Sequence, residues 1–140
     1  MQDKPIKKIF VCEFITGGGL NHHELNSSIV NEGLLMRDAL LKDLASLSYE
    51  LYVTIDSRLE CHNALTYPQY IQASQNVWSE WETLITQVDA VWLIAPETDG
   101  NLERLTSLAL KHQKIIIGCG LKTINICRSK LSSHSFFKQH

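Results

Sequence analysis

The chain has 140 residues, of which 44% are apolar, 8% are aromatic and 20% are charged, and its formal net charge is -2. A chain of this size and composition can fold as one compact domain and bury roughly 68% of its unfolded surface. These values exclude a disordered chain and a multi-domain assembly. They also exclude generic nucleic-acid binding, because there is no excess of basic residues to hold a phosphate backbone by counterion release.

The cysteine pattern indicates a reducing compartment. The chain has four cysteines, none with Cys-x-x-Cys spacing: Cys12, Cys61, Cys119 and Cys127. A core of this size needs no disulfides, so we expect four free thiols. The apolar run at residues 9–12 is too short for a signal peptide, and no run is long enough to span a membrane. We therefore expect a cytoplasmic protein that binds neither nucleic acid nor membranes.

Short apolar runs alternate with stretches of helical periodicity. The runs at residues 6–14, 49–55, 90–95 and 114–118 are rich in β-branched and aromatic residues and lack a clean inward/outward alternation. Such strands are buried on both faces, as in a parallel sheet whose strands are joined by crossover helices. The sequence predicts a three-layer α/β domain with a mainly parallel sheet of four or five strands.

Three helices are expected between these strands. The first follows residues 26–28, whose side chains can cap its N-terminus. Its predicted inward face contains Ile29, Gly33, Met36, Leu40, Leu44 and Leu47, and its outward face contains Arg37, Lys42 and Asp43. The other two helices are predicted over residues 76–87 and 101–112. Residues 59–74 hold either a short helix or only a loop, because Pro68 interrupts the periodicity.

Three loops follow predicted strands, at residues 13–19, 56–58 and 96–100, and ligands bind at such positions in open α/β sheets. The first loop contains Gly17, Gly18 and Gly19. These glycines would let the backbone approach a ligand closely, and their N–H groups could form an anion-binding nest. Alternatively, they simply make a flexible loop. They match neither the P-loop nor the dinucleotide-binding pattern.

Carboxylates gather in the same loops, namely Glu13, Asp56, Glu97 and Asp99. This concentration suits an amine or ammonium ligand. Glu97 and Asp99 also precede a helix, where Asp99 could be the cap, whereas Glu13 ends a buried strand and needs a partner or solvent. No metal site is expected, because His22 and His23 lack further ligands at suitable spacing.

Several segments resemble the N-terminal part of ATP-grasp ligases, in particular the group of tyramine–glutamate ligases, which act in methanofuran coenzyme biosynthesis. The resemblance is carried by residues 13–19, 31–41, 56–59 and 90–100, of which residues 92–100 are the most specific. Ligases of this superfamily join a Rossmann-like pre-ATP-grasp domain to two domains that close on ATP and Mg²⁺. They activate a carboxylate as an acyl phosphate, which an amine attacks to form an amide.

The resemblance implies that residues 1–122 form the pre-ATP-grasp domain. Residues 123–140 would be the start of the next ATP-grasp segment, of which the remainder is expected to be missing because the chain is truncated. It assigns to substrate binding the residues Glu13, Thr16, Gly17, Gly18, Gly19, Asp56, Arg58, Glu97, Thr98 and Asp99. Lys130 would reach the nucleotide phosphates, although Ser129 stands where the family has an aspartate.

By the same resemblance, the parent protein is an ATP-dependent carboxylate–amine ligase that uses ATP and Mg²⁺. This chain alone would contain no catalytic residue, be inactive and retain no cofactor. Its expected partners are a small-molecule amine or amino acid, the downstream ATP-grasp domains and a second copy in a homodimer. The alternative is a stand-alone small-molecule binding or interaction module with the same fold and no catalysis, and a weaker third hypothesis is a flavodoxin-like nucleotide binder.

Overall fold

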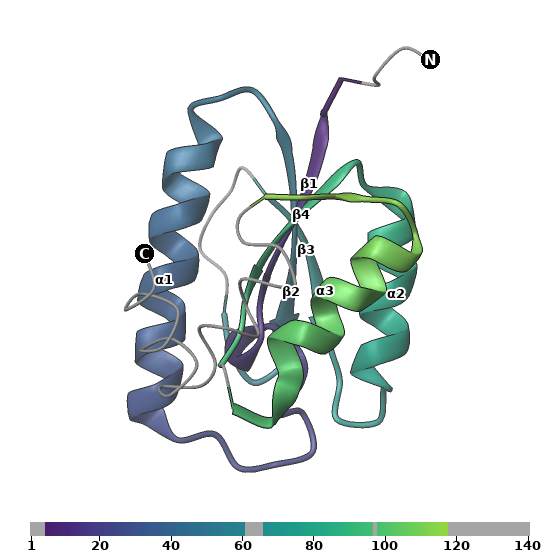
Figure 1. The fold of residues 1–140 in the computed structure, drawn as a ribbon. Coiled ribbons are helices and arrows are strands. Elements are labelled where there is room, and N and C mark those ends of the chain that lie inside the picture. Colours follow the sequence, from purple (N-terminus) through teal and green to yellow (C-terminus); the bar gives the residue numbers. More distant parts are fainter. Residues whose placement is uncertain (1–4, 61–65, 97, 118–140) are drawn as a thin grey trace, which may run out of the picture.

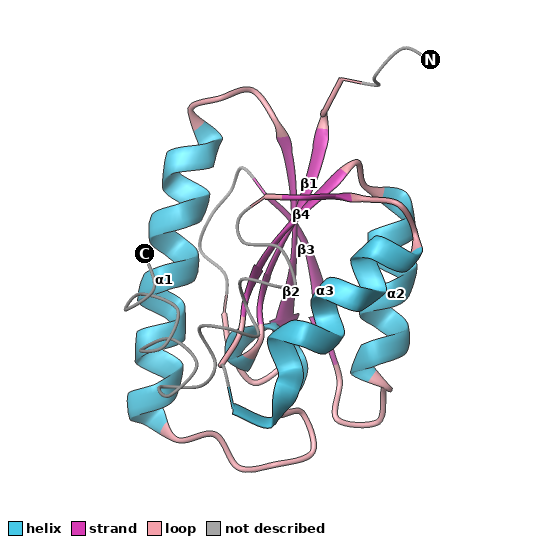
Figure 2. Cartoon of the chain, viewed as in Figure 1, coloured by secondary structure: helices cyan, strands magenta, loops and turns pink. Residues whose placement is uncertain are grey.

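The computed structural model of the chain describes residues 5–60, 66–96 and 98–117. Within these residues, parallel strands form one sheet in the order β3-β2-β1-β4-β5 (Figure 1). The strands are β1 (Lys8–Glu13), β2 (Glu50–Asp56), β3 (Thr66–Ile71), β4 (Ala90–Ile94) and β5 (Ile115–Ile116). Helix α1 (Ser27–Ala45) covers one face, and α2 (Val77–Gln87) and α3 (Asn101–Lys111) cover the other (Figure 2). This three-layer arrangement confirms the predicted fold class.

Strand β1 lies at the centre of the sheet, between β2 and β4. Val11 is in register with Val53 on one side and with Trp92 on the other. The helix that follows β1 lies on one face of the sheet, whereas the helix that follows β4 lies on the opposite face. In a doubly wound sheet, a crevice opens beyond the carboxyl ends of two such strands. The fold therefore places a candidate binding crevice where β1 and β4 end.

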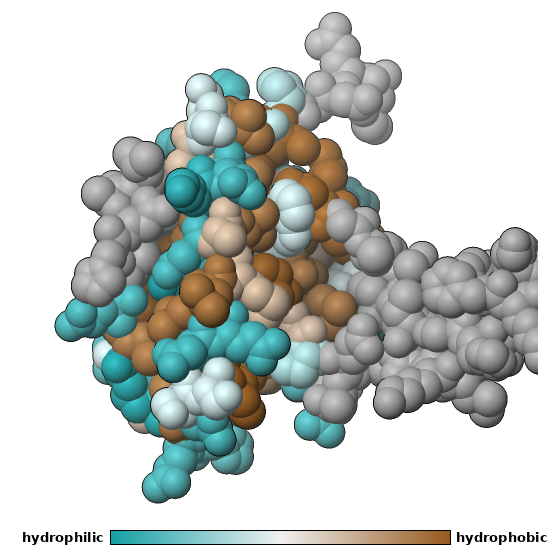
Figure 3. All heavy atoms as spheres, turned by 90° about the vertical axis from the view of Figure 1, so that its left-hand side faces the viewer, coloured by the Kyte–Doolittle hydropathy of each residue, from teal (hydrophilic) through white to brown (hydrophobic). Residues whose placement is uncertain are grey.

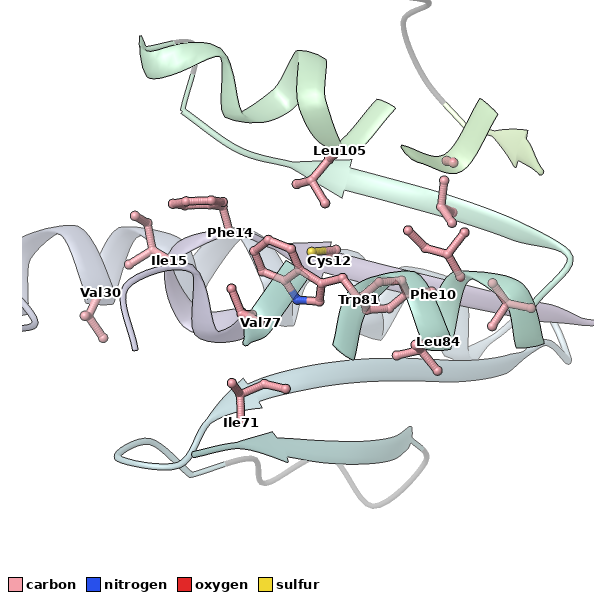
Figure 4. Packing of buried hydrophobic residues seen from close by; sticks show 14 residues of the cluster. Phe10, Cys12, Phe14, Ile15, Val30, Ile71, Val77, Trp81, Leu84 and Leu105 are labelled. Carbon is pink, nitrogen blue, oxygen red and sulfur yellow. The ribbon is translucent and has the colours of Figure 1, made fainter. Parts of the chain in front are cut away.

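Both faces of β1 are buried, which explains why its sequence shows no alternation. Phe10 and Cys12 pack toward α2 and α3 in one apolar cluster, and Figure 4 shows Trp81 in the middle of it. Ile9 and Val11 pack toward α1 in a second cluster. Burial of the Cys12 thiol, with a smaller effect of the nearby negative charge of Glu13, raises the pKa of Cys12 well above its usual value.

Strand β3 corrects the interpretation of residues 59–74 as a short helix or a loop. The N–H of Ser57 donates to the carbonyl of Ile71 at 2.9 Å, so the backbone of Ile71 faces β2. Because successive residues of a strand alternate, the backbone of Pro68 faces away from β2, at the outer edge of the sheet. An outward-facing edge position needs no N–H donor and tolerates proline. Pro68 therefore fits this strand and limits pairing at its free edge.

Helix α1 exists as predicted, but its buried face differs from the expected one. The buried residues are Val30, Gly33, Arg37, Leu41 and Leu44. Ile29 and Met36, predicted to face inward, are 46% and 44% exposed, and Leu47 is 57% exposed. Arg37 was predicted to face outward and is instead buried. The close contact of Gly33 with the end of β1 orients the helix in this way.

The helix starts depend on two asparagines. Asn26 Oδ1 accepts from the backbone N–H of Ser28 at 2.9 Å at the start of α1. Asn76 Oδ1 accepts from the N–H of Trp78 at 3.1 Å at the start of α2. At α3 none of the described side chains caps the helix: Gly100 is the N-cap residue, with φ 68°, and the expected cap by Asp99 is not formed. The predicted helices at 76–87 and 101–112 are confirmed.

No helix in the described ranges is both long enough and apolar enough to cross a membrane. Cys12 is a free thiol, as expected. The other three cysteines lie outside the described residues, as does the predicted segment at residues 123–140. The expectation of four free thiols is therefore confirmed at Cys12 alone.

Candidate functional site

A pocket of about 280 Å³ lies at the carboxyl ends of β1 and β4, next to the first turns of α1. The three loops predicted to carry function follow β1, β2 and β4, which are neighbours in the sheet, so their ends share one edge. The pocket is lined by Glu13, Ile15, Ile29, Glu32, Gly33, Met36, Ile94, Ala95 and Pro96. Its walls are thus mainly apolar, with two carboxylates among them.

Glu13 is the last residue of β1 and is only 2% exposed. Its Oε1 accepts from the N–H of Ile15 at 3.2 Å, and its Oε2 accepts from the N–H of Thr16 at 2.7 Å. These bonds fasten the following loop to the strand end. In the part of the chain that the structure describes, no Lys, Arg or His forms an ion pair with Glu13. Within the described residues the two oxygens accept from backbone N–H groups only, and they retain lone pairs for another donor.

Gly33 allows α1 to pack directly on this carboxylate. A Cβ atom at Gly33 would lie 2.6 Å from Glu13 Oε2 and 3.2 Å from Thr16 Cγ2. A side chain there would require the Glu13 carboxylate or the helix to move. The same approach directs Ile29 and Met36, on either side of Gly33 along the helix, to the walls of the pocket.

The loop with three glycines forms the π-helical turn η1 (Ile15–Gly19). A Cβ at Gly17 would lie 2.9 Å from Thr54 Oγ1, and Gly18, with φ 106°, lies directly against Ile71. The glycines thus let the turn pack tightly over the ends of β2 and β3. None of the three lines the 280 Å³ pocket, although Gly19 lines a separate one. Their predicted contact with a ligand stays a prediction.

Trp81 holds the glycine turn from within the core. Its Nε1–H donates to Thr54 Oγ1 at 3.0 Å and to the carbonyl of Gly17 at 3.3 Å. The ring is fully buried and packs against Phe14, with 5.7 Å between ring centroids. Trp81 therefore belongs to the core.

Asp56 and Arg58 form a clamp at the end of β2. Asp56 is 1% exposed and accepts from Arg58 Nε at 2.9 Å and from Nη2 at 2.7 Å. The guanidinium also donates to the carbonyls of His23 and Leu20, at 2.6 and 2.8 Å. The clamp therefore ties the loop after β1 to the end of β2.

The clamp also shifts the pKa of Asp56. Burial alone would raise this pKa, but hydrogen bonds from Arg58 and its positive charge have the larger combined effect and lower it. Neither residue lines the pocket that contains Glu13, and their predicted role in substrate binding stays a prediction.

The remaining predicted site residues are placed as follows. Thr16 lies in the turn η1, and its buried hydroxyl has no hydrogen-bond partner among the described residues. Thr98 and Asp99 lie in the short turn η2 (Thr98–Gly100), where Asp99 is exposed with φ 61°. Glu97 and Lys130 lie outside the described residues.

Sequence reasoning missed several residues of the pocket wall, among them Glu32, Met36 and Ile94. Glu32 and Met36 could have been found only by knowing which side of α1 faces the sheet. The described residues contain no group of three His, Cys, Asp or Glu side chains that could hold a metal ion.

Comparisons with known proteins identify the type of domain. Residues 49–124, more than half of the chain, match the pre ATP-grasp 3 domain family. The structure is similar to the crystal structure of a protein from Archaeoglobus fulgidus assigned to the ATP-grasp superfamily, with a TM-score of 0.74 and 23% sequence identity. The similarity covers 92% of this chain and 38% of that one, so this chain spans well under half of the other's length. A search among curated proteins finds no match.

Proposed function

The chain belongs to the pre ATP-grasp 3 domain family, and from this premise we propose that it is the N-terminal, substrate-binding domain of an ATP-grasp ligase that joins a carboxylate to an amine. In such a ligase, ATP phosphorylates the carboxylate and leaves as ADP, and the amine attacks the acyl phosphate to form an amide with release of inorganic phosphate. The proposal depends chiefly on one observation. The buried Glu13 carboxylate has no cationic partner in the described residues and faces a pocket at the carboxyl edge of the sheet.

The chemistry of the pocket favours an amine as its ligand. An ammonium group would supply the positive charge that Glu13 lacks and would donate to the remaining lone pairs of its oxygens. The apolar walls formed by Ile15, Met36 and Ile94 suit a hydrocarbon or aromatic body attached to that nitrogen. Tyramine, the amine of the ligase group that the sequence resembles, is therefore the first substrate to test.

The nucleotide and Mg²⁺ are proposed to bind elsewhere in the parent protein. The described residues offer no metal-binding cluster, so this part of the chain does not fit a Mg²⁺ site. We assign both to the downstream ATP-grasp domains, with Lys130 as a contact to the phosphates. On this proposal residues 1–140 alone are inactive, and the parent enzyme works in the cytoplasm, where ATP is available.

A homodimer is proposed through the exposed apolar residues of α1. Ile29, Leu35, Met36 and Leu47 are between 44% and 74% exposed. Figure 3 shows the α1 side of the molecule, where apolar residues are exposed among hydrophilic ones. Exposed apolar surface of this kind favours association. Sedimentation that shows only monomer at micromolar concentration would contradict the dimer.

The proposed activity is tested with the complete natural gene product, incubated with ATP, Mg²⁺, glutamate and tyramine. We expect ADP release that requires both glutamate and tyramine, together with one amide product whose mass equals that of the two substrates minus water. Residues 1–140 alone are the matched control and should release no ADP. If the natural product ends at His140 and shows no ATP-dependent chemistry, the stand-alone binding module replaces the ligase.

A further inference from the structure

A second pocket, of about 410 Å³, lies between α2 and α3, on the sheet face opposite to α1. Trp78 and Leu108 give it an apolar wall. Hydrogen-bond donors surround that wall, including Arg104 and the hydroxyls of Ser79 and Ser107. A cavity of this size, with an apolar wall and a few convergent polar groups, has the character of a small-molecule site. It shares no lining residue with the pocket that contains Glu13.

The guanidinium of Arg104 is held in place by Trp78. Its Cζ lies 3.8 Å from the ring centroid. The indole is in turn supported from the core by Trp81, in an edge-on contact with 4.9 Å between centroids and an angle of 83°. A guanidinium in a cation–π contact can still donate hydrogen bonds from its N–H groups to another partner. Arg104, whose side chain is exposed, therefore presents a fork of donors at the pocket.

Arg104 is also the cation of this pocket for which the described residues provide no counter-ion. Lys111 pairs with Glu82 at 3.0 Å, and His112 contacts the same carboxylate at 2.8 Å. These two partners hold the pKa of Glu82 below its usual value, so its negative charge is already matched. Among the described residues, no carboxylate pairs with Arg104. The pocket thus has one uncompensated positive charge beside an apolar wall.

We propose that this pocket binds a small organic carboxylate. The carboxylate would accept two parallel hydrogen bonds from Arg104, and the apolar body of the ligand would lie against Trp78 and Leu108. One uncompensated cation matches a singly charged carboxylate better than a phosphate, and the forked guanidinium matches the two carboxylate oxygens. This inference does not depend on the proposed ligase activity, because the site lies on the other side of the sheet.

Benzoate is the probe, and calorimetric titration of the 140-residue chain at constant ionic strength is the test. We expect saturable binding at one site. Arg104→Gln should weaken it by about tenfold or more, because the charged fork is lost. Arg104→Lys, which keeps the charge but not the fork, should also bind more weakly than the wild type. Lys42→Gln removes an exposed cation from α1, on the opposite face, and should leave the affinity unchanged.

Inorganic phosphate, titrated in the same way, should bind at least about tenfold more weakly than benzoate, because it has no apolar body. A titration without saturation, or equal affinity in wild type and Arg104→Gln, would overturn the site. Tighter binding of phosphate than of benzoate would overturn the assignment to a carboxylate. Arg104 is exposed, so unchanged circular dichroism is expected for both of its variants.

Discussion

Gly33 of α1 lies against the carboxylate of Glu13 at the end of β1, so closely that a Cβ at Gly33 would be 2.6 Å from Glu13 Oε2. This contact links three features of the molecule. It fixes which face of α1 is buried, it shields the Glu13 carboxylate, and it leaves Ile29 and Met36 at the wall of the neighbouring pocket.

Gly33→Ala tests this contact. Inside a helix, alanine in place of glycine normally stabilises by roughly 0.5–1 kcal/mol. Here the added methyl group must displace Glu13 or the helix, so we expect a loss of about 1–3 kcal/mol in the free energy of unfolding. Urea denaturation measures it, with Asn31→Ala on the exposed side of α1 as the matched control. A Gly33→Ala variant as stable as the wild type would show that the close contact is absent.

The clamp between Asp56 and Arg58 predicts a pH dependence of stability. The pKa of Asp56 is lower in the folded protein than its unfolded value of 3.8, because Arg58 stabilises the ionised form. The ionised carboxylate therefore stabilises the fold above that pH, and this contribution is lost as the pH falls through the folded pKa. The stability difference between wild type and Asp56→Asn should shrink on going from neutral pH to about pH 3. A difference that stays constant with pH would rule out this role of Asp56.

We predict that the stability of the fold tolerates substitution of the buried Arg37. The side chain is 2% exposed and pairs with the largely exposed Asp38 at 2.9 Å, and within the described part of the chain its Nη1 has no hydrogen-bond partner. Replacing an incompletely paired buried charge by an apolar side chain of similar size is often neutral or stabilising. We expect Arg37→Met to change the free energy of unfolding by less than about 1 kcal/mol, or to increase it.

Leu41→Ala is the comparison for Arg37→Met, because Leu41 lies one turn further along the same buried face. It should cost about 2–5 kcal/mol in the free energy of unfolding. Thermal and urea unfolding of both variants provide the measurement. Equal losses in the two would mean that Arg37 stabilises the fold as much as a core leucine does.

The fold was largely predictable because β1, β2 and β4 are buried on both faces and therefore read as continuous apolar runs. Strand β3 was missed for the opposite reason: it lies at the edge, Tyr67 and Tyr70 are exposed, and Pro68 is compatible with a strand only at an outward position. No local signal in the sequence distinguishes that position from a turn.

The buried side of α1 was mispredicted because the helix has two apolar stripes, offset by one residue, that share Gly33 and Leu44. The choice between them depends on the tertiary contact with Glu13, which lies 20 residues earlier in the chain. For the site, Glu13 was predictable as a charged residue that ends a buried strand. Glu32 and Met36 were not, because their place depends on the orientation of α1.

The central claim, that Glu13 binds the amine of a ligase reaction, is tested most directly by the KM values of Glu13→Gln in the complete natural protein. Glutamine keeps the size and one acceptor oxygen but removes the charge that would hold an ammonium group. We predict that KM for tyramine rises about tenfold or more while KM for ATP stays within about twofold. Glu32→Gln, at an exposed position of the same pocket, is the matched control and should have a smaller effect. An unchanged KM for the amine, or equal rises in both values, would contradict the account.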